Sequence, residues 1–355
     1  MPPITSIRPE EPANEERLSK KQGKVILDHG GGGRASRELV QSYFIPRFTN
    51  PFLEKMDDSA VVDFPAGRLA VTTDCYVVDP IFFPGGDIGM LAVNGTVNDL
   101  SAQGAQPLFL SAAFILEEGF ELADLERILI SMAAASRKAS VSVIAGDTKV
   151  VPRGKGDKIY INTTGVGLVQ DDVNISGSNA KVLDKVILSG PIGDHGIAVL
   201  SQREGLAFDT DLRSDCAPLN QMVEEILTVT REVHAMRDPT RGGVAASLNE
   251  IAAQSDVGIV LTEGAIGVKE EVKSACEILG LDPLYVANEG KLLVFVPPEH
   301  TSGVLEAMRQ NQYGRDAHIV GEVVADHRGR VVMRTTTGGT RIVDMPLGEQ
   351  FPRIC

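Results

Sequence analysis

Residues 88–103 read Ile-Gly-Met-Leu-Ala-Val-Asn-Gly-Thr-Val-Asn-Asp-Leu-Ser-Ala-Gln. Apolar side chains recur there with helical spacing, at Met90, Leu91, Val97 and Leu100. This period predicts a helix. Asn94 and Asn98 are four residues apart and share one face of it. That face either meets a ligand or is solvated, and the sequence leaves both interpretations open.

Strand-like and helix-like stretches alternate on both sides of this helix. In the first half we predict strands at Ala60–Asp63, Leu69–Thr73, Pro107–Leu116, Val141–Val151 and Lys158–Val169, and a helix at Leu122–Ala139. In the second half we predict strands at Lys185–Ser189, Gly258–Leu261, 291–296, 318–324, 330–334 and 341–344. Helices are expected there at His195–Arg203, Leu219–Ala235, Gly242–Ala253, 268–279 and 299–311. The pattern predicts an α+β fold in which helices cover mixed or antiparallel sheets.

The length of 355 residues favours two domains over one core. We predict a flexible leader at 1–22, domains at 23–175 and 176–345, and a flexible tail at 346–355. The leader lacks the apolar segment of a secretory signal, and no apolar run approaches the roughly 20 residues that span a bilayer. The net charge of −14 argues against a nucleic-acid partner. Four separated cysteines without a C-x-x-C motif favour a reducing cytoplasm.

A run of four glycines, from Gly30 to Gly33, precedes a helical pattern that begins at Ser36. Consecutive glycines allow backbone N–H groups to approach phosphate oxygens, and a helix start favours negative charge. Gly31 and Gly32 are therefore candidate phosphate-binding residues, with a flexible turn as the alternative. The run is not a Walker A loop, because no Gly-Lys-Ser/Thr follows it.

Acidic residues recur at the predicted ends of strands and helices, at Asp58, Asp74, Asp99 and Asp147. Magnesium prefers oxygen ligands and commonly bridges carboxylates to substrate phosphates. These four are our candidate magnesium ligands, and Thr73 beside Asp74 is a candidate nucleotide contact. Any one of them alone is as well explained as a cap or turn residue.

Two later motifs also offer polar groups at the start of an element. Asp238-Pro239-Thr240-Arg241-Gly242-Gly243 combines an acid, a hydroxyl and a guanidinium before a helix, which suits either an anion or a simple helix cap. Glu289 precedes a predicted strand and is a candidate general base, although a loop glutamate is more commonly solvated.

The chain ends on Cys355, after a ten-residue stretch from Pro346 that could extend roughly 30 Å. A thiolate is a strong nucleophile, and its terminal position would allow it to act as a carrier. Frayed ends are common, but few of them finish on a thiol. We expect the other cysteines to be packing residues: Cys75, Cys216 and Cys276.

Together these motifs resemble the PurM or AIR synthetase-related superfamily, from about Lys24 onward. The ending Pro352-Arg353-Ile354-Cys355 resembles that of its HypE members, which are hydrogenase maturation proteins. The resemblance implies a PurM-like fold whose N-terminal sheet forms a barrel at a homodimer interface, with an α/β sandwich as C-terminal domain. It implies that ATP and Mg²⁺ serve to dehydrate an S-carbamoyl group on the C-terminal cysteine to a thiocyanate.

The same resemblance implies two partners, the carbamoyltransferase HypF and the iron-carrying HypC–HypD complex, which receives the cyano group. It implies roles for Cys355 as carrier, Lys149 near the transferred phosphate and Glu289 as base. Nucleotide or tail contacts would come from Asn94, Asn98, Asp238, Thr240, Arg241 and Gly242. The alternatives are a small-molecule kinase of the thiamine monophosphate kinase type, which has no use for Cys355, and a non-enzymatic scaffold.

Overall fold

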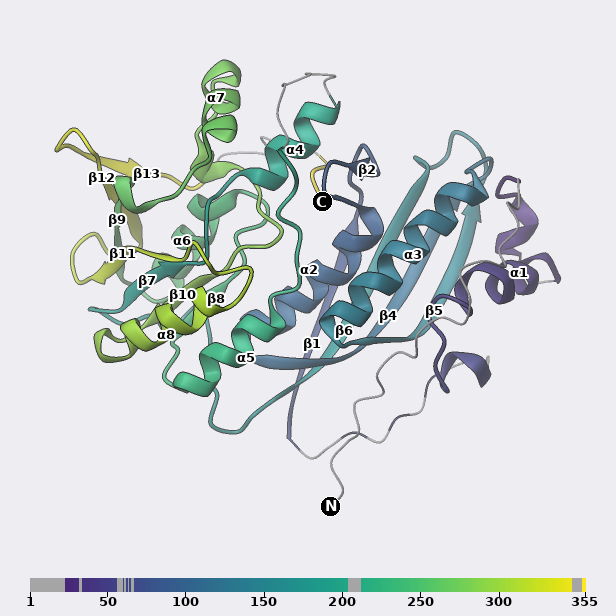
Figure 1. Cartoon of the computed structure of the whole chain (residues 1–355), viewed down its shortest axis with the longest axis horizontal. Coiled ribbons are helices and arrows are strands. Elements are labelled where there is room, and N and C mark those ends of the chain that lie inside the picture. The colour runs from purple at the N-terminus through teal and green to yellow at the C-terminus, as the bar shows by residue number, and fades with distance from the viewer. Residues whose placement is uncertain are drawn as a thin grey trace.

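The computed structural model of the chain describes residues 23–31, 34–55, 60, 62, 64, 67–203, 212–346 and 353–355. Two sheets dominate it, a four-stranded sheet in the first half and a seven-stranded sheet in the second (Figure 1). The described C-terminus lies between them, beside α4 (Asp194–Arg203) and β2 (Phe82–Phe83). This α+β arrangement agrees with the predicted fold class.

The four-stranded sheet has the order β1-β6-β4-β5. Its strands are β1 (Arg68–Tyr76), β4 (Ala105–Glu117), β5 (Ser142–Val151) and β6 (Ile159–Val169). Neighbours run antiparallel except for the parallel pair β4 and β5. Helices α2 (Ile88–Ala102) and α3 (Leu122–Ala139) cover one face (Figure 1). Smaller elements of this half are η2 (Leu27–Gly30), α1 (Arg34–Leu39), η3 (Val40–Phe44), η4 (Leu53–Lys55) and β3 (Gly86–Asp87).

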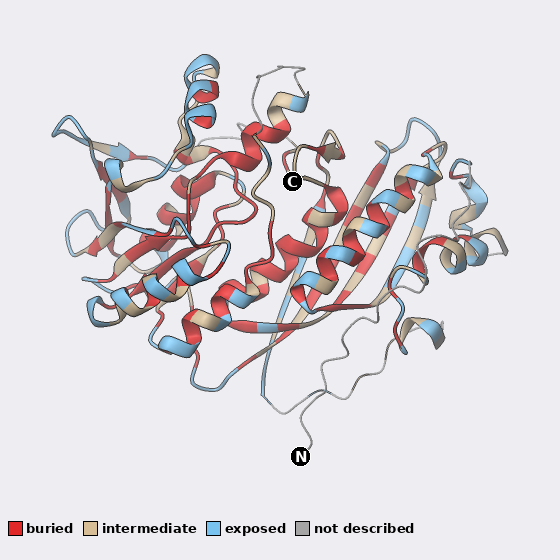
Figure 2. Ribbon diagram, in the orientation of Figure 1, coloured by how far each residue is buried: buried red, intermediate tan, exposed pale blue. Residues whose placement is uncertain are grey.

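Helix α2 lies at the centre of the molecule and is buried on almost every side (Figure 2). Asp87 caps its start, where Oδ1 accepts hydrogen bonds from the N–H groups of Gly89 (2.8 Å) and Met90 (3.0 Å). Helix α3 instead buries one stripe, from Leu125 to Ala139, and exposes the other. The polar residues of α2 must therefore find partners inside the protein.

The seven-stranded sheet has the order β13-β12-β9-β11-β7-β10-β8, and its neighbours are antiparallel except for β12 and β9. Its strands are β7 (Lys185–Leu188), β8 (Ala235–Arg237), β9 (Gly258–Thr262), β10 (Leu293–Val296), β11 (His318–Val324), β12 (Arg330–Arg334) and β13 (Thr340–Val343). The helices around it are α4, α5 (Asn220–Val229), α6 (Gly243–Gln254), α7 (Glu270–Leu279), α8 (Pro298–Gln310), η5 (Glu263–Ala265) and η6 (Pro283–Tyr285). Apolar clusters on both of its faces bury it.

Two of the predicted elements are not found as predicted. The predicted helix Leu219–Ala235 is wrong in its second half, because α5 ends at Val229 and Ala235 begins β8, which pairs with β10. That pairing is a contact with a distant segment, so the local apolar spacing does not reveal it. Two of the four residues of the predicted strand Ala60–Asp63 lie outside the described residues, and the other two, Ala60 and Val62, are not in a strand.

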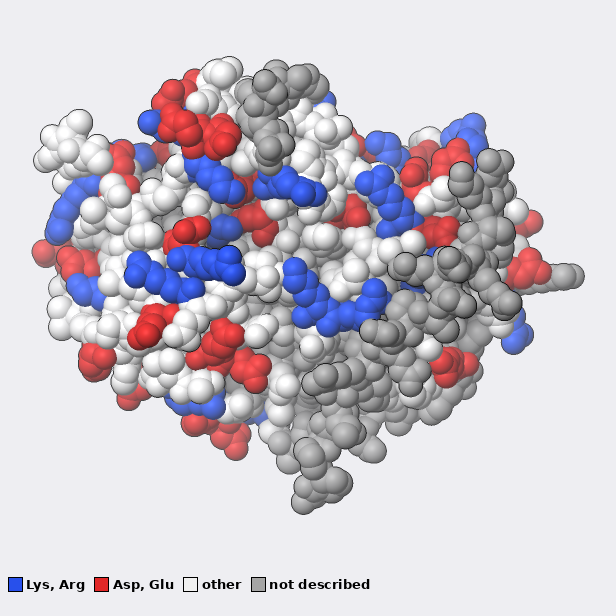
Figure 3. All heavy atoms as spheres, in the orientation of Figure 1, with Lys and Arg blue, Asp and Glu red and all other residues white. Residues whose placement is uncertain are grey.

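The uncovered face of the four-stranded sheet is apolar in part. Leu69 is 56% exposed, Val71 61% and Ile115 44%. On the side of the molecule seen in Figure 3, acidic and basic side chains of the described residues are interspersed. None of the described helices is both long and apolar enough to cross a membrane.

Candidate active site

An acidic cluster lies where the two sheets meet, beneath α2. Asp74 comes from the helix-covered face of β1, Asp99 from α2, Asp238 from the residue after β8, and Glu289 from the loop before β10. Tyr76 Oη donates to Asp74 Oδ2 (3.4 Å), and Thr72 Oγ1 donates to Asp99 Oδ2 (2.8 Å). Asp238 and Glu289 are buried, and Glu289 Oε1 has no hydrogen-bond partner.

Burial and mutual repulsion govern the titration of this cluster. Burial, followed by the charges of Asp238 and Asp74, raises the pKa of Asp99 to about 8. Burial raises the pKa of Asp238 to about 6. The pKa of Glu289 rises well above its ordinary value, through burial first and then through its acidic neighbours. Such a cluster holds protons unless a cation neutralises it. Within the described residues, no three acidic, histidine or cysteine side chains are already arranged as metal ligands.

Asn94 and Asn98 do not lie on a solvated face, which was one of the two interpretations that the sequence left open. Both are buried, at 2% and 1% exposure. Asn98 Nδ2 donates to the carbonyls of Ala217 (3.0 Å) and Glu289 (3.3 Å), and its Oδ1 accepts from Leu219 N–H (2.8 Å). The amide of Asn98 thus joins α2 to the second half of the chain, and the nucleotide contact predicted there stays a prediction.

A second candidate site lies at the glycine-rich turn. A cavity of about 190 Å³ is bordered there by the turn, by β5 and by apolar side chains that include Phe44, Phe48 and Phe114. A Cβ on Gly30 would lie 2.4 Å from the backbone nitrogen of Val150, so only glycine permits this close approach. Gly31 is exposed beside the cavity, whereas Gly32 lies outside the described residues.

The predicted magnesium ligands do not all converge within one chain. Asp74 and Asp99 meet, and Asp58 lies outside the described residues. Asp147 sits on the opposite edge of the sheet, three strand spacings from β1, or roughly 14 Å. It also points to the uncovered face, as does Lys149, whose Nζ lies 3.7 Å from Asp147 Oδ2. Both are exposed at the rim of the cavity beside the turn.

The Asp238–Gly243 segment forms a backbone turn at the start of α6. Thr240 N–H donates to the carbonyl of Asp238 (3.0 Å), and Gly243 N–H donates to that of Thr240 (2.9 Å). Asp238 faces the acidic cluster, Arg241 is exposed, and Thr240 is half-buried. The structure therefore unites only Asp238 of this motif with the other acids.

The described end of the tail is docked rather than extended. Ile354 is 2% exposed, and Arg353 forms an ion pair with Asp157. A terminal carboxylate oxygen of Cys355 accepts from the N–H of Val77 (3.1 Å), the residue after Tyr76. The end of the tail is thus held at the end of β1, the strand that carries Asp74. Cys276 is buried as expected, Cys216 is half-buried, and Cys75 is exposed on the uncovered sheet face, contrary to our expectation.

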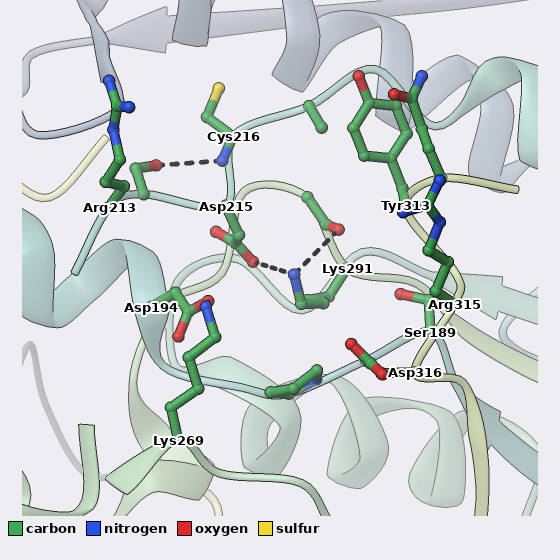
Figure 4. Close-up of a pocket in the computed structure, with 16 residues that line it drawn as sticks. Ser189, Asp194, Arg213, Asp215, Cys216, Lys269, Lys291, Tyr313, Arg315 and Asp316 are labelled. Atoms are coloured by element: carbon green, nitrogen blue, oxygen red, sulfur yellow. Dashed lines mark hydrogen bonds and ion pairs between the residues drawn. The ribbon is translucent and has the colours of Figure 1, made fainter. Parts of the chain in front are cut away.

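A cavity of about 480 Å³ is lined in part by Gly290 and Lys291, the two residues that follow Glu289 (Figure 4). Lys291 points into it, and its Nζ lies 2.9 Å from Asp215 Oδ2. Lys269 and Asp194 form a second ion pair at 2.5 Å. Burial acts to raise the pKa of Asp215, but Lys291 and His195 hold it below its ordinary value. This wall of the site is therefore charged and internally paired, unlike the acidic cluster.

Sequence reasoning missed several residues at this site. They are Tyr76, His195, Arg203, Ser214, Asp215 and Lys291. Each lies in a segment without a ligand-binding motif, and their proximity arises from the packing of the two sheets. Only the short spacing between Glu289 and Lys291 could have suggested a further charge.

Comparison with known proteins agrees with this architecture. Residues 56–169 match the family model of the AIR synthase related protein N-terminal domain, and 182–334 match that of its C-terminal domain. The fold is thus that of the AIR synthase-related, PurM-like proteins. Thiamine-monophosphate kinase from Stenotrophomonas maltophilia shares this fold, with a TM-score of 0.61 at 19% identity, covering 79% of this chain and 89% of the other.

The carbamoyl dehydratase HypE of Cupriavidus necator is 53% identical over 339 residues, covering 95% of this chain and 97% of its own. A crystal structure of hydrogenase maturation protein HypE in complex with ATP superposes with a TM-score of 0.90 at 50% identity, covering 93% and 99%. A HypE–HypF complex superposes with a TM-score of 0.77 at 50% identity, covering 87% and 99%. The chain belongs to the HypE family of carbamoyl dehydratases.

Proposed function

We propose that this chain uses ATP to dehydrate an S-carbamoyl group on its own Cys355, giving a thiocyanate for hydrogenase maturation. The observation that carries this is the docking of the tail end, where Cys355 bonds to the end of β1, the strand that carries Asp74, and Ile354 is buried against His195. A tail that only frayed would not bury Ile354 between the two halves of the protein.

The proposed chemistry balances. The amide oxygen of the S-carbamoyl group takes the γ-phosphoryl group of ATP, with ADP leaving. The nitrogen then loses its protons as the carbon–oxygen bond breaks, so that phosphate departs and a carbon–nitrogen triple bond remains on sulfur. Phosphorylation is needed because an amide oxygen is otherwise a poor leaving group. Positioning and charge stabilisation do most of the catalytic work in such transfers.

The residues present fit a divalent cation. Asp74, Asp99 and Asp238 supply carboxylate oxygens, which Mg²⁺ prefers, and their repulsion favours binding of a cation. Mg²⁺, when bound there, would offset the negative charge of these carboxylates. Glu289 would accept the nitrogen proton, because neutralisation of its acidic neighbours removes part of what keeps it protonated.

We further propose that the nucleotide binds at the glycine-rich turn. The apolar cavity beneath it, with Phe44 and Phe114 in its wall, suits a purine base, and the turn's N–H groups suit phosphates. Asp147 and Lys149 lie at its rim, where Lys149 would approach a phosphate. An ATP complex of a 50% identical HypE supports nucleotide binding by this chain.

A homodimer formed through the uncovered face of the four-stranded sheet is our proposal for assembly. The exposed Leu69, Val71 and Ile115 on this face would be covered in a dimer. HypF would load the carbamoyl group onto the tail, as the HypE–HypF complex of a relative suggests. The HypC–HypD complex would take up the cyano group.

The test is intact-mass spectrometry of the chain after incubation with ATP, magnesium, carbamoyl phosphate and HypF, followed by mapping of the tail peptide. We expect one carbamoyl group on Cys355, converted in the presence of ATP to a product lighter by one water. An unmodified tail, with HypF active on a known HypE, would refute the proposal and favour a small-molecule kinase.

A further inference from the structure

The end of the tail is held by its backbone. The carbonyl of Arg353 accepts from Asp79 N–H (3.1 Å) and Arg203 Nη2 (2.7 Å), and a terminal carboxylate oxygen of Cys355 accepts from Val77 N–H (3.1 Å). Between them, the carbonyl of Ile354 accepts from His195 Nε2 (2.9 Å). Each of the last three residues thus has a donor for its main-chain oxygen, and only His195 among these donors is a buried side chain.

The contacts of His195 fix its protonation. A carbonyl can only accept, so Nε2 must carry the proton. Burial lowers the pKa of His195, which leaves Nδ1 without a proton in the neutral ring. Nδ1 therefore accepts from Ser214 Oγ, 2.8 Å away. The ring also packs edge-on against Phe83, with centroids 5.4 Å apart, which restrains its orientation.

Ser214 continues this chain of bonds toward Glu289. Its Oγ accepts from Cys216 N–H (3.1 Å), so the hydroxyl is used in both directions. The residues on either side of Cys216 hold the backbone of Glu289: Asp215 Oδ1 accepts from Glu289 N–H (3.0 Å), and Ala217 N–H donates to its carbonyl (3.4 Å). The segment Ser214–Ala217 thus joins the tail-binding histidine to the proposed base.

The segment Ser214–Ala217 is packed so closely against the loop of Glu289 that neither can move alone. A Cβ on Gly290 would lie 1.9 Å from the carbonyl oxygen of Asp215, so the two backbones are in direct contact. Lys291 anchors Asp215 from the other side (Figure 4). A shift of Ser214 would therefore pass to the loop that carries Glu289.

We propose that His195 is a positioning residue for the dehydration: by binding the carbonyl of Ile354 it aligns, through Ser214–Ala217, the loop that carries Glu289. Docking of the tail and alignment of the base are then a single event. This inference rests on the proposed function. Its consequence is that the base reaches its working position only when the tail that carries the S-carbamoyl group is docked.

Three variants of the full chain test this, with two measurements on each. Accessibility of Cys355 is measured by the rate of alkylation of the tail peptide, and catalysis by single-turnover dehydration of the HypF-loaded chain across pH. Ser214→Ala cuts the relay but keeps the bond to Ile354. His195→Gln keeps a donor near the Nε2 position and loses the acceptor for Ser214. His195→Phe loses both.

We expect Ser214→Ala and His195→Gln to leave the alkylation rate within about twofold of wild type and to slow dehydration about tenfold, with a shifted acidic limb of the pH profile. His195→Phe should raise alkylation about tenfold as well. Ser201→Ala is the matched control, because Ser201 lies on α4 as His195 does and its hydroxyl donates to the carbonyl of Ala198 in the same helix (3.0 Å). This variant should match wild type in both measurements.

A Ser214→Ala chain with the wild-type rate and pH profile would overturn the relay, whether or not His195→Phe folds. Loss of dehydration in Ser201→Ala equal to that in Ser214→Ala would also overturn it, because the effect would then be general. A wild-type chain that is carbamoylated but never dehydrates would instead refute the proposed function.

Discussion

Replacing Asp99 with asparagine should make the protein more stable and inactive at the same time. Burial, followed by the charges of Asp238 and Asp74, raises the pKa of Asp99 from 3.8 to about 8. A carboxyl whose pKa is higher in the folded state costs nothing below pH 3.8. Its cost then grows as pH rises toward 8, because the unfolded chain ionises more readily.

A pH of 7 lies about three units above 3.8, the ordinary pKa of the group. At about 1.4 kcal/mol per unit, the ionised Asp99 therefore destabilises the folded protein by about 4 kcal/mol as an upper limit. We expect Asp99→Asn to raise the free energy of unfolding by about half of that amount, since protons in the cluster are shared among Asp99, Asp238 and Glu289. Asparagine keeps a side-chain oxygen for the hydroxyl of Thr72, so the gain is not offset by loss of that bond.

The assay is urea unfolding of both proteins from pH 4.5 to pH 8, with and without magnesium. The difference in the free energy of unfolding should be small at pH 4.5 and widen toward pH 8. Magnesium should narrow it, because a bound cation stabilises only the wild-type cluster. Asp171→Asn, in an exposed turn, is the control. A difference that stays constant with pH would refute the reasoning.

Three further predictions concern the other parts of the site. Glu289→Gln should accept a carbamoyl group from HypF yet lose dehydration by at least about a hundredfold, measured by tail mass spectrometry, and a wild-type rate would exclude Glu289 as base. Gly30→Ala should weaken ATP affinity about tenfold, measured with a fluorescent analogue, because the added Cβ meets Val150; unchanged affinity would move the nucleotide elsewhere. Val71→Asp should shift a dimer toward monomer in sedimentation velocity, with His327→Asp on an exposed turn as control, and an unshifted dimer would place the interface on another face.

The elements with strong periodicity could be predicted from the sequence. Helix α2 and strands β4 to β6 lie within a few residues of the predicted ranges, because their apolar spacing is local information. Helix α5 was predicted too long, because the residues after Val229 gain their structure by pairing with a distant strand. Local preference cannot reveal such a partner.

The motifs likewise identified several of the chemical groups without their arrangement. Asp74, Asp99, Asp238, Glu289 and Cys355 were all candidates from their neighbours in sequence. That the first four share one buried cluster, and that Asp147 does not, follows from strand order and from which face each side chain takes. A side chain's face depends on its register in the sheet, which the motif alone does not state.

The sequence by itself determined the fold class, the family and the presence of a terminal thiol, since each follows from local spacing or from the last four residues. Only the tertiary structure decided what holds that thiol. His195, Ser214 and Glu289 come from separate segments of the second half, and they are joined by hydrogen bonds that form when these segments fold together and the tail docks. Such contacts depend on the free energy of the whole fold, so they cannot be predicted from any single segment of the sequence.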